Sequence, residues 1–319
     1  MDRSRRKLLI GAAGFAALAV NSGTGLAQSQ TLLQTSTGTP IPSHAPESFS
    51  AVSADGTRLA GQMQGDAAAP EILFIHGLRQ SRLNWEKQFA DPTLAGFRQV
   101  SFDLRGHGDS GKPTSLDAYS DSDRWADDVA AVIDAAKLRR PVLVGWSLGG
   151  YAVGAYLRKY GGSRIAGINL VDALTKFAAD LLTPETIAFS KSTTSPDLAT
   201  RTSATIEFLA ACFHQQPSAA EMQRMLVVNG MTAREVNEGF LKTTTTDFDA
   251  AFRAFSGPIL LTHGIHDRLV RVAMSERIKT LRSRSEISLY GQSGHAPFFE
   301  EPERFGRELS QFVELASRG

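Results

Sequence analysis

The chain reads Pro141-Val142-Leu143-Val144-Gly145-Trp146-Ser147-Leu148-Gly149-Gly150 ahead of a helix-like stretch at residues 151–160. The apolar run predicts a buried strand, so Ser147 stands at a sharp turn from strand to helix. A turn this tight leaves no room for side chains at positions 145 and 149, where glycine stands. Free N–H groups at the helix start point toward the serine. This is the G-x-S-x-G pattern of a nucleophile elbow; because the pattern also arises by chance, its meaning depends on partner residues.

Apolar runs alternate with helix-like segments on both sides of this turn. Buried strands are predicted at residues 71–75, 99–103, 141–144, 165–171, 258–262 and 286–290, and helices at residues 120–137, 151–160, 273–281 and 302–316. Residues 49–53 and 58–64 flank an Asp-Gly turn and predict a β-hairpin. The strand runs are continuous rather than alternating, which is typical of a parallel sheet covered on both faces. The predicted fold class is therefore α/β.

Residues 174–255 interrupt this alternation. They contain no convincing strand pattern, but they contain helix starts at Thr183-Pro184 and Ser195-Pro196 and capping-box patterns at residues 218–221 and 232–235. We expect a helical lid here, inserted into a core formed by residues 48–173 and 256–319. Most of the large apolar lid residues are expected in the lid's own core and some in a substrate pocket: Phe177, Phe189, Phe208, Phe213, Met222, Met225 and Met231.

The first 27 residues have the pattern of an export signal. The segment Ser4-Arg5-Arg6-Lys7-Leu8-Leu9 resembles the twin-arginine signal, and an apolar stretch follows to Val20. Small residues precede a plausible cleavage point after Ala27. The apolar stretch is shorter than the roughly 20 residues of a membrane span, so no stable membrane insertion is expected after cleavage. Residues 28–47 are polar and predict a disordered tether.

This leader predicts a bacterial protein carried by the twin-arginine export machinery to the periplasm or the exterior. The net charge of +1 over 319 residues gives no reason to expect a nucleic-acid partner. The single cysteine, Cys212, cannot form an intramolecular disulfide and is interpreted as a small buried residue.

A serine nucleophile needs a histidine base, and the histidine needs a carboxylate that orients it. Of the seven histidines, only His295 stands in a loop between the last predicted strand and the last predicted helix. Loops at the carboxyl ends of parallel strands form the binding sites of open α/β sheets. His295 is therefore the candidate base.

Three aspartates follow predicted strands and could orient His295. Asp267 is preferred, Asp172 is the alternative, and Asp103 is expected to organise its own glycine-rich turn. A metal site built from His263, His266 and Asp267 matches no established ligand spacing, so no metal or other cofactor is expected.

The order Ser147, Asp267, His295 resembles that of the α/β-hydrolase superfamily. The likeness extends over residues 48–317 and includes His76-Gly77 after a strand and the segment 103–108. Within the superfamily, the chain is similar to small bacterial esterases, including cofactor-free haloperoxidase-like perhydrolases and carboxyl methyl esterases with a Gly-Trp-Ser elbow. The resemblance implies a mostly parallel eight-stranded sheet with helices on both faces. It also implies an oxyanion hole formed by the backbone N–H groups of Leu78 and Leu148.

The expected activity is hydrolysis of a small or medium apolar ester or lactone through an acyl-enzyme on Ser147. Phe298 and Phe299, beside His295, are candidates for the substrate pocket, and Trp146 either lines the pocket or covers the elbow. Perhydrolase or haloperoxidase-type chemistry is the alternative, although the loop Leu78-Arg79-Gln80 lacks the proline that the resemblance associates with it. A small-molecule binding protein without catalysis is a further alternative. The same triad also serves amides, thioesters and carbon–carbon bonds next to a ketone.

Overall fold

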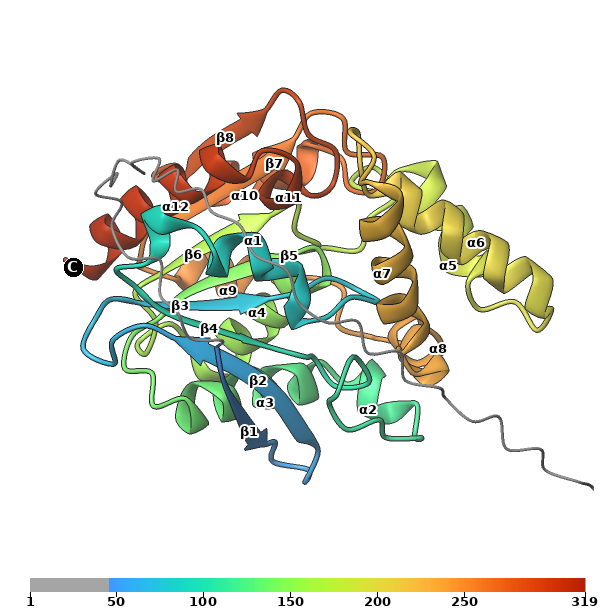
Figure 1. Cartoon of the computed structure of the whole chain (residues 1–319), viewed down its shortest axis with the longest axis horizontal. Coiled ribbons are helices and arrows are strands. Elements are labelled where there is room, and N and C mark those ends of the chain that lie inside the picture. The colour runs from blue at the N-terminus through green and yellow to red at the C-terminus, as the bar shows by residue number, and fades with distance from the viewer. Residues whose placement is uncertain (1–45, 319) are drawn as a thin grey trace, which may run out of the picture. The chain divides into compact units, whose positions relative to one another are not determined.

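The computed structural model describes residues 46–318, which contain an eight-stranded sheet flanked by helices (Figure 1). The strand order is β1-β2-β4-β3-β5-β6-β7-β8. Strand β2 is antiparallel to β1 and β4, and all other neighbouring strands are parallel. The predicted fold class is therefore confirmed. The export signal and residues 28–45 of the predicted tether lie outside the described residues.

The strands lie within two residues of their predicted bounds. They are β1 (Glu47–Val52), β2 (Arg58–Gln64), β3 (Glu71–Ile75), β4 (Arg98–Phe102), β5 (Val142–Trp146), β6 (Gly167–Val171), β7 (Ile259–Gly264) and β8 (Glu286–Tyr290). The predicted end of the tether was wrong at Glu47, because this residue pairs with Met63 in the first hairpin.

Helices fill the connections between the strands. Those of the core are η1 (Arg82–Trp85), α1 (Glu86–Phe89), η2 (Pro92–Leu94), α2 (Asp117–Ser120), α3 (Ser122–Ala135), α4 (Leu148–Tyr160), α10 (Ala273–Leu281), α11 (Pro297–Glu300) and α12 (Pro302–Ser317). No helix in the described part of the chain is both long enough and apolar enough to span a membrane.

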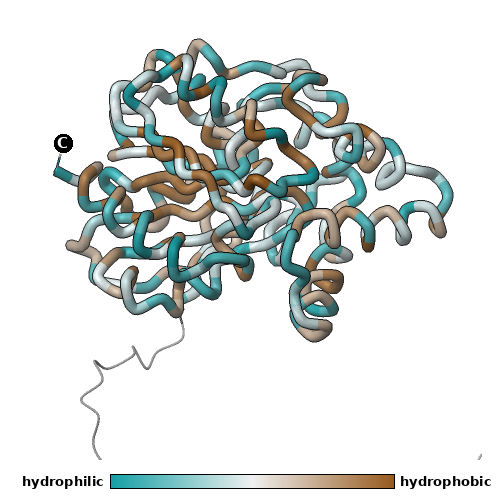
Figure 2. The backbone as a smooth tube through the Cα atoms, turned by 90° about the horizontal axis from the view of Figure 1, so that it is seen from above, coloured by the Kyte–Doolittle hydropathy of each residue, from teal (hydrophilic) through white to brown (hydrophobic). Residues whose placement is uncertain are grey.

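Each face of the sheet has its own apolar core. On one face, α3 and α4 pack with Trp125, Val129 and Tyr151 against the strands. On the other face, α12 packs with Phe305 and Phe312. Figure 2 shows the hydrophobic residues running along the central strands between the helix layers. Burial of a large apolar side chain stabilises the fold by about 1.5–3 kcal/mol, so these two layers hold the helices against the sheet.

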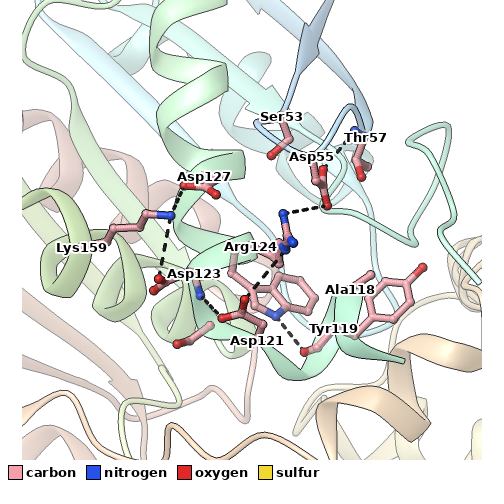
Figure 3. A network of polar contacts seen from close by, with 12 residues as sticks. Ser53, Asp55, Thr57, Ala118, Tyr119, Asp121, Asp123, Arg124, Asp127 and Lys159 are labelled. Atoms are coloured by element: carbon pink, nitrogen blue, oxygen red, sulfur yellow. Dashed lines mark hydrogen bonds and ion pairs between the residues drawn. The ribbon is translucent and has the colours of Figure 1, made fainter. Parts of the chain in front are cut away.

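Polar pairs cover the outer surface where α3 and α4 meet (Figure 3). Lys159 Nζ on α4 lies 2.6 Å from Asp127 Oδ1 and 3.9 Å from Asp123 Oδ2 on α3. Arg124 lies 3.8 Å from Asp55, beside the first hairpin. The basic partners, Lys159 and Arg124, are partly exposed, and surface ion pairs contribute about 0–1 kcal/mol each, so the apolar contacts beneath them hold the helices in place.

The predicted lid region is helical, and in Figure 1 its helices α5 to α8 gather at one side of the sheet. The helices are α5 (Pro184–Ser192), α6 (Leu198–Ala211), α7 (Ala219–Gly230), α8 (Arg234–Phe240) and α9 (Asp249–Ala254). The predicted starts at Thr183 and Ser218 are confirmed, because both side chains cap their helices.

Two predicted helix starts in this region were wrong. The cap of α6 is Asp197 rather than Ser195, because the Asp197 carboxylate accepts from the N–H of Thr200 at 2.7 Å. Helix α8 begins at Arg234 without a side-chain cap. The residue before it, Ala233, donates its N–H to the carbonyl of Gly106 at 2.8 Å, so this backbone is fastened to the core instead.

Candidate active site

Ser147 lies between β5 and α4 with a strained backbone, at φ 53° and ψ −116°. A non-glycine residue in such a region costs about 1–3 kcal/mol, and the surrounding structure must hold it there. The Ser147 N–H donates to the carbonyl of Val171 at 3.0 Å, and its own carbonyl accepts from Leu174 N–H at 2.9 Å. Strand β6 and the segment after it therefore hold the turn, and the serine remains partly exposed.

Glycine is required on both sides of Ser147 because the backbones approach closely. A Cβ atom at Gly149 would lie 2.3 Å from the carbonyl oxygen of Ile75 in β3, and one at Gly145 would lie 2.8 Å from the oxygen of Gly149. A Cβ atom at Gly77 would lie 3.1 Å from the Cβ of Ser147. The loop after β3 is thus in contact with the elbow.

His295 and Asp267 form the hydrogen bond that the sequence predicts. His295 Nδ1 donates to Asp267 Oδ2 at 2.7 Å. The other oxygen, Asp267 Oδ1, accepts from the N–H groups of Leu269 and Val270 at 2.7 and 3.1 Å. Burial opposes ionisation of Asp267, but His295 and these donors outweigh it and hold the pKa of Asp267 below its ordinary value. An ionised Asp267 can fix the tautomer of His295 and stabilise its cation.

One cavity of about 200 Å³ is lined by Ser147, His295, Leu78 and Leu148. These residues follow or belong to different elements: Leu78 follows β3, Ser147 follows β5 and His295 follows β8. The carboxyl ends of parallel strands meet at one edge of the sheet, which is why these distant segments come together. The structure thus brings the predicted nucleophile, base and oxyanion-hole residues together at one cavity. Asp267 is hydrogen-bonded to His295.

Two buried histidines hold the loop that follows β3. His76 Nδ1 donates to a nearby carbonyl at 2.7 Å, and His107 Nδ1 does so at 2.8 Å. Their Nε2 atoms accept from Leu104 N–H at 2.9 Å and Arg79 N–H at 3.0 Å. Burial lowers the pKa of His76 to about 4 and that of His107 to about 3, so both rings are neutral at pH 7. Their part at the site is to position this loop.

Asp103 was expected to organise its own glycine-rich turn, and it also contacts the loop that follows β3. Its Oδ1 accepts from the backbone N–H of Arg82 at 2.7 Å, and its Oδ2 accepts from Asp109 N–H at 2.9 Å. The Arg82 guanidinium pairs with the same carboxylate. Asp103 therefore links the loops that follow β3 and β4.

Asp172, the alternative carboxylate, lies behind Asp267. Its Oδ1 accepts from Gly264 N–H at 2.9 Å and lies 3.5 Å from His263 Nε2. Burial, together with the charge of Asp267, raises the pKa of Asp172 well above its ordinary value. Because the pKa of Asp172 is raised and that of Asp267 is lowered, Asp267 is the better partner for a histidine cation, in agreement with its hydrogen bond to His295.

Ligand atoms of Asp172, His263 and Asp267 lie within 4.8 Å of one another. The His263 ring is already engaged by the protein, since Nδ1 lies 2.8 Å from Ser275 Oγ and Nε2 lies 3.0 Å from the carbonyl of Val270. The other residue of the rejected metal pattern, His266, is exposed, with its ring stacked 3.8 Å from that of His214. The chemistry of this donor set does not favour a resident ion.

Phe298 and Phe299, the candidates for the substrate pocket, do not line the cavity with Ser147, and neither does Trp146. The segment after His295 turns into α11, which directs Phe298 into the core on the opposite side. There its ring centroid lies 4.9 Å from that of Trp146, behind His295. Phe299 is partly buried and lies under Lys87, whose Nζ is 3.5 Å from the ring centroid. Trp146 thus covers the elbow, which is one of its two predicted roles.

The lid supplies much of the cavity wall. Of the lid residues singled out in the sequence, Phe177, Phe189 and Phe208 line the cavity, and Phe213 and the three methionines do not. Thr186, Ser190, Thr193 and Asn237 add polar groups to a mainly apolar surface. Arg79 also lines the cavity, and this role was missed in the sequence. Its place directly after Leu78 was the available signal.

The lid is fastened to the loop that carries His295. The Glu300 carboxylate accepts from Gly294 N–H at 2.8 Å and from the N–H groups of His214 and Gln215 at 2.8 and 2.7 Å. His295 N–H donates to the carbonyl of Cys212 at 2.9 Å. The end of α6 therefore helps to set the position of the histidine.

Comparison with known proteins gives the family. Residues 70–302 match the family model described as alpha/beta hydrolase fold. The chain belongs to the α/β-hydrolase family, and within it to the small bacterial esterases and non-heme haloperoxidases. It is thus a hydrolase of the esterase and haloperoxidase type.

Three relatives illustrate this assignment. A candidate aryl esterase from Burkholderia cenocepacia is 40% identical with a TM-score of 0.82, covering 86% of this chain and 100% of that one. The esterase RhEst1 from Rhodococcus sp. ECU1013 is 30% identical with a TM-score of 0.78, covering 84% and 98%. A bifunctional esterase/perhydrolase from Acinetobacter calcoaceticus is 27% identical over 281 residues, covering 81% and 97%.

Proposed function

We propose that the protein is a serine carboxylic-ester hydrolase acting on small or medium apolar esters or lactones. The observation that carries the proposal is the 2.7 Å hydrogen bond between Asp267 and His295 at a cavity that also exposes Ser147 on a strained elbow. A nucleophile, a base and an orienting carboxylate in this order make an acyl-transfer site.

In the first half of the reaction, Ser147 Oγ attacks the ester carbonyl while His295 Nε2 takes its proton. The resulting oxyanion is stabilised by the backbone N–H groups of Leu78 and Leu148, two residues that line the cavity. One such donor typically supplies about 2.7–4 kcal/mol of transition-state stabilisation. His295 then gives the proton to the leaving alcohol, and the acyl group stays on Ser147.

In the second half, His295 takes a proton from water, and the resulting hydroxide attacks the acyl-enzyme. Collapse of the second oxyanion releases the acid and returns the proton to Ser147. Asp267 stabilises the His295 cation in both halves. Apart from the water, the groups that act in these steps are side chains and backbone N–H groups of this chain.

Perhydrolysis is the second candidate, favoured by the similarity to an esterase/perhydrolase. In that reaction hydrogen peroxide, instead of water, attacks the acyl-enzyme, and the product is a peracid. The loop Leu78-Arg79-Gln80 without proline weighs against it. A steady rate of peracid formation from acetate and peroxide that exceeds ester turnover would favour this candidate.

The test of the esterase proposal combines turnover with active-site labelling. Wild type should hydrolyse p-nitrophenyl acetate and butyrate and react with a fluorophosphonate probe, and Ser147→Ala should do neither. A folded wild-type protein that neither turns over nor is labelled would overturn the proposal. That result would instead favour a binding protein without catalysis.

A further inference from the structure

We propose that Arg79 binds a carboxylate of the substrate, so that the preferred ester carries an anionic group besides its ester carbonyl. The inference deepens the proposed ester hydrolysis and rests on it. The preferred substrate is then an ester with an apolar middle and a charged end, rather than a wholly apolar ester.

The backbone of Arg79 lies close to the nucleophile. Gly77, in contact with Ser147, is only two residues away, and two residues span at most about 7 Å. Arg79 has a positive φ of 62°, which is uncommon for a residue with a side chain. Its N–H donates to the buried ring of His107 at 3.0 Å, so this unusual conformation is held by the core. The fold therefore fixes where the Arg79 side chain begins.

The Arg79 side chain lines the cavity and is only partly satisfied there. Nη2 donates to Thr205 Oγ1 on α6 at 2.7 Å. Nε and Nη1 are buried and have no hydrogen-bond partner among residues 46–318. Burial lowers the pKa of Arg79 to about 10, so the guanidinium is still charged at pH 7. A cation with two buried, unpartnered donors thus lies at the cavity.

The other residues of the cavity wall give the Arg79 cation no acidic partner. Among the described residues that line the cavity, none is an aspartate or glutamate. Most are apolar, including Phe177, Phe189 and Phe208 from the lid. A charge in such surroundings is stabilised only by a partner of opposite sign, and guanidinium matches carboxylate in shape and donor geometry. A substrate carboxylate would supply this partner.

The carboxylate could belong to the acyl part or to the alcohol part of the ester. Monomethyl adipate and methyl hexanoate are a matched pair for the acyl part, the first charged and the second neutral. The esters 4-carboxyphenyl butyrate and phenyl butyrate are the corresponding pair for the alcohol part. For each pair, the ratio of kcat/KM for the charged ester to that for the neutral one measures the preference for an anion.

The decisive comparison is between wild type and Arg79→Met. In one of the two pairs, the ratio of kcat/KM for the charged ester to that for the neutral ester should be about 10- to 100-fold lower in Arg79→Met than in wild type. A loss of this size is expected for a hydrogen bond between charged groups. The variant's kcat/KM for the charged ester of that pair should fall much further than its kcat/KM for the neutral ester. Arg79→Lys should retain part of the preference. Arg201→Met, which removes a neighbouring cation on α6 outside the cavity wall, should leave both ratios unchanged.

Two results would overturn the proposal. One is an unchanged ratio in both pairs for Arg79→Met. The other is an equal loss on charged and neutral esters, which would mean that Arg79 only supports the lid through Thr205. Failure of the esterase proposal looks different, because wild type would then hydrolyse none of the four esters and would not be labelled by the fluorophosphonate.

Discussion

The indole N–H of Trp146 donates a 2.6 Å hydrogen bond to the backbone carbonyl of His295, across a sequence separation of 149 residues. The residue before the nucleophile therefore holds the backbone of the proposed base. Trp146 is 2% exposed and lies outside the cavity wall, so its contribution to the site is made through His295.

Trp146→Phe should lower kcat about 10-fold and leave the preference for acyl chain length unchanged. The phenylalanine keeps most of the packing but leaves the carbonyl of His295 without its donor, a loss of about 1–3 kcal/mol for a buried group. Measurement of kcat/KM over p-nitrophenyl esters of increasing length checks both parts. Phe208→Ala is the contrast, because Phe208 lines the cavity and its loss should shift the preference toward longer chains. A shifted preference in Trp146→Phe would contradict the assignment.

Asp267→Asn should reduce kcat about 10⁴-fold, because the amide favours the wrong tautomer of His295 and cannot stabilise its cation. Asp172→Asn should change kcat far less, since His295 is hydrogen-bonded to Asp267, whereas Asp172 accepts from the N–H of Gly264. Steady-state kinetics of both variants, with circular dichroism to verify folding, makes the comparison. The reverse order of effects would show that Asp172 is the orienting carboxylate.

Gly149→Ala should destabilise the protein and impair the elbow. The new Cβ would lie 2.3 Å from the carbonyl oxygen of Ile75, and overpacking of a filled site costs about 1–3 kcal/mol. Gly230→Ala is the matched control, since nothing lies within 4 Å of a Cβ at the end of α7. Urea unfolding should show a loss for the first variant and no loss for the second. Equal stabilities would mean that α4 can move away from β3.

The free energy of unfolding should fall as the pH drops from about 6.5 toward 4. An unfolded chain protonates its histidines near pH 6.5, whereas His76 in the folded state resists protonation until about pH 4. The difference is of order 3 kcal/mol for His76 alone, present in full above pH 6.5 and lost on acidification.

Asp172 acts in the opposite direction, because its raised pKa makes the folded state lose stability as the pH rises. His76→Asn separates the two effects, since Asp172 is common to both proteins. Urea unfolding from pH 7 to pH 4.5 should show a smaller slope in the variant than in wild type. Identical slopes would mean that His76 titrates normally in the folded protein.

Export is a separate proposal, carried by the sequence alone. Replacing the arginine pair with Arg5→Lys and Arg6→Lys should block twin-arginine export, so that precursor accumulates inside the cell. Immunoblots of cell fractions, with a Sec-exported reference protein as control, measure the distribution. Unchanged export of the double variant would remove the twin-arginine assignment.

The sequence was most informative where one residue type is required at a fixed place. Gly145, Ser147 and Gly149 predicted the elbow because backbone contacts exclude other residues there. The order of Ser147, Asp267 and His295 along alternating strands and helices predicted the site, since the ends of parallel strands meet at one edge. The bounds of the strands followed from their continuous apolar runs.

The cavity wall could not be predicted in the same way. Which residues face a cavity depends on how the lid packs over the sheet. The spacing of apolar residues along a helix does not predict this packing. Phe298 looked like a pocket residue because it is near His295 in sequence, but the turn into α11 buries it behind Trp146. Arg79 looked like an ordinary loop residue, but His107 and Thr205 direct it into the cavity. The chain by itself thus determined the fold and the order of the candidate triad, because both depend on local backbone requirements. The tertiary structure alone decided the residues that face the substrate, because that depends on contacts between segments far apart in the chain.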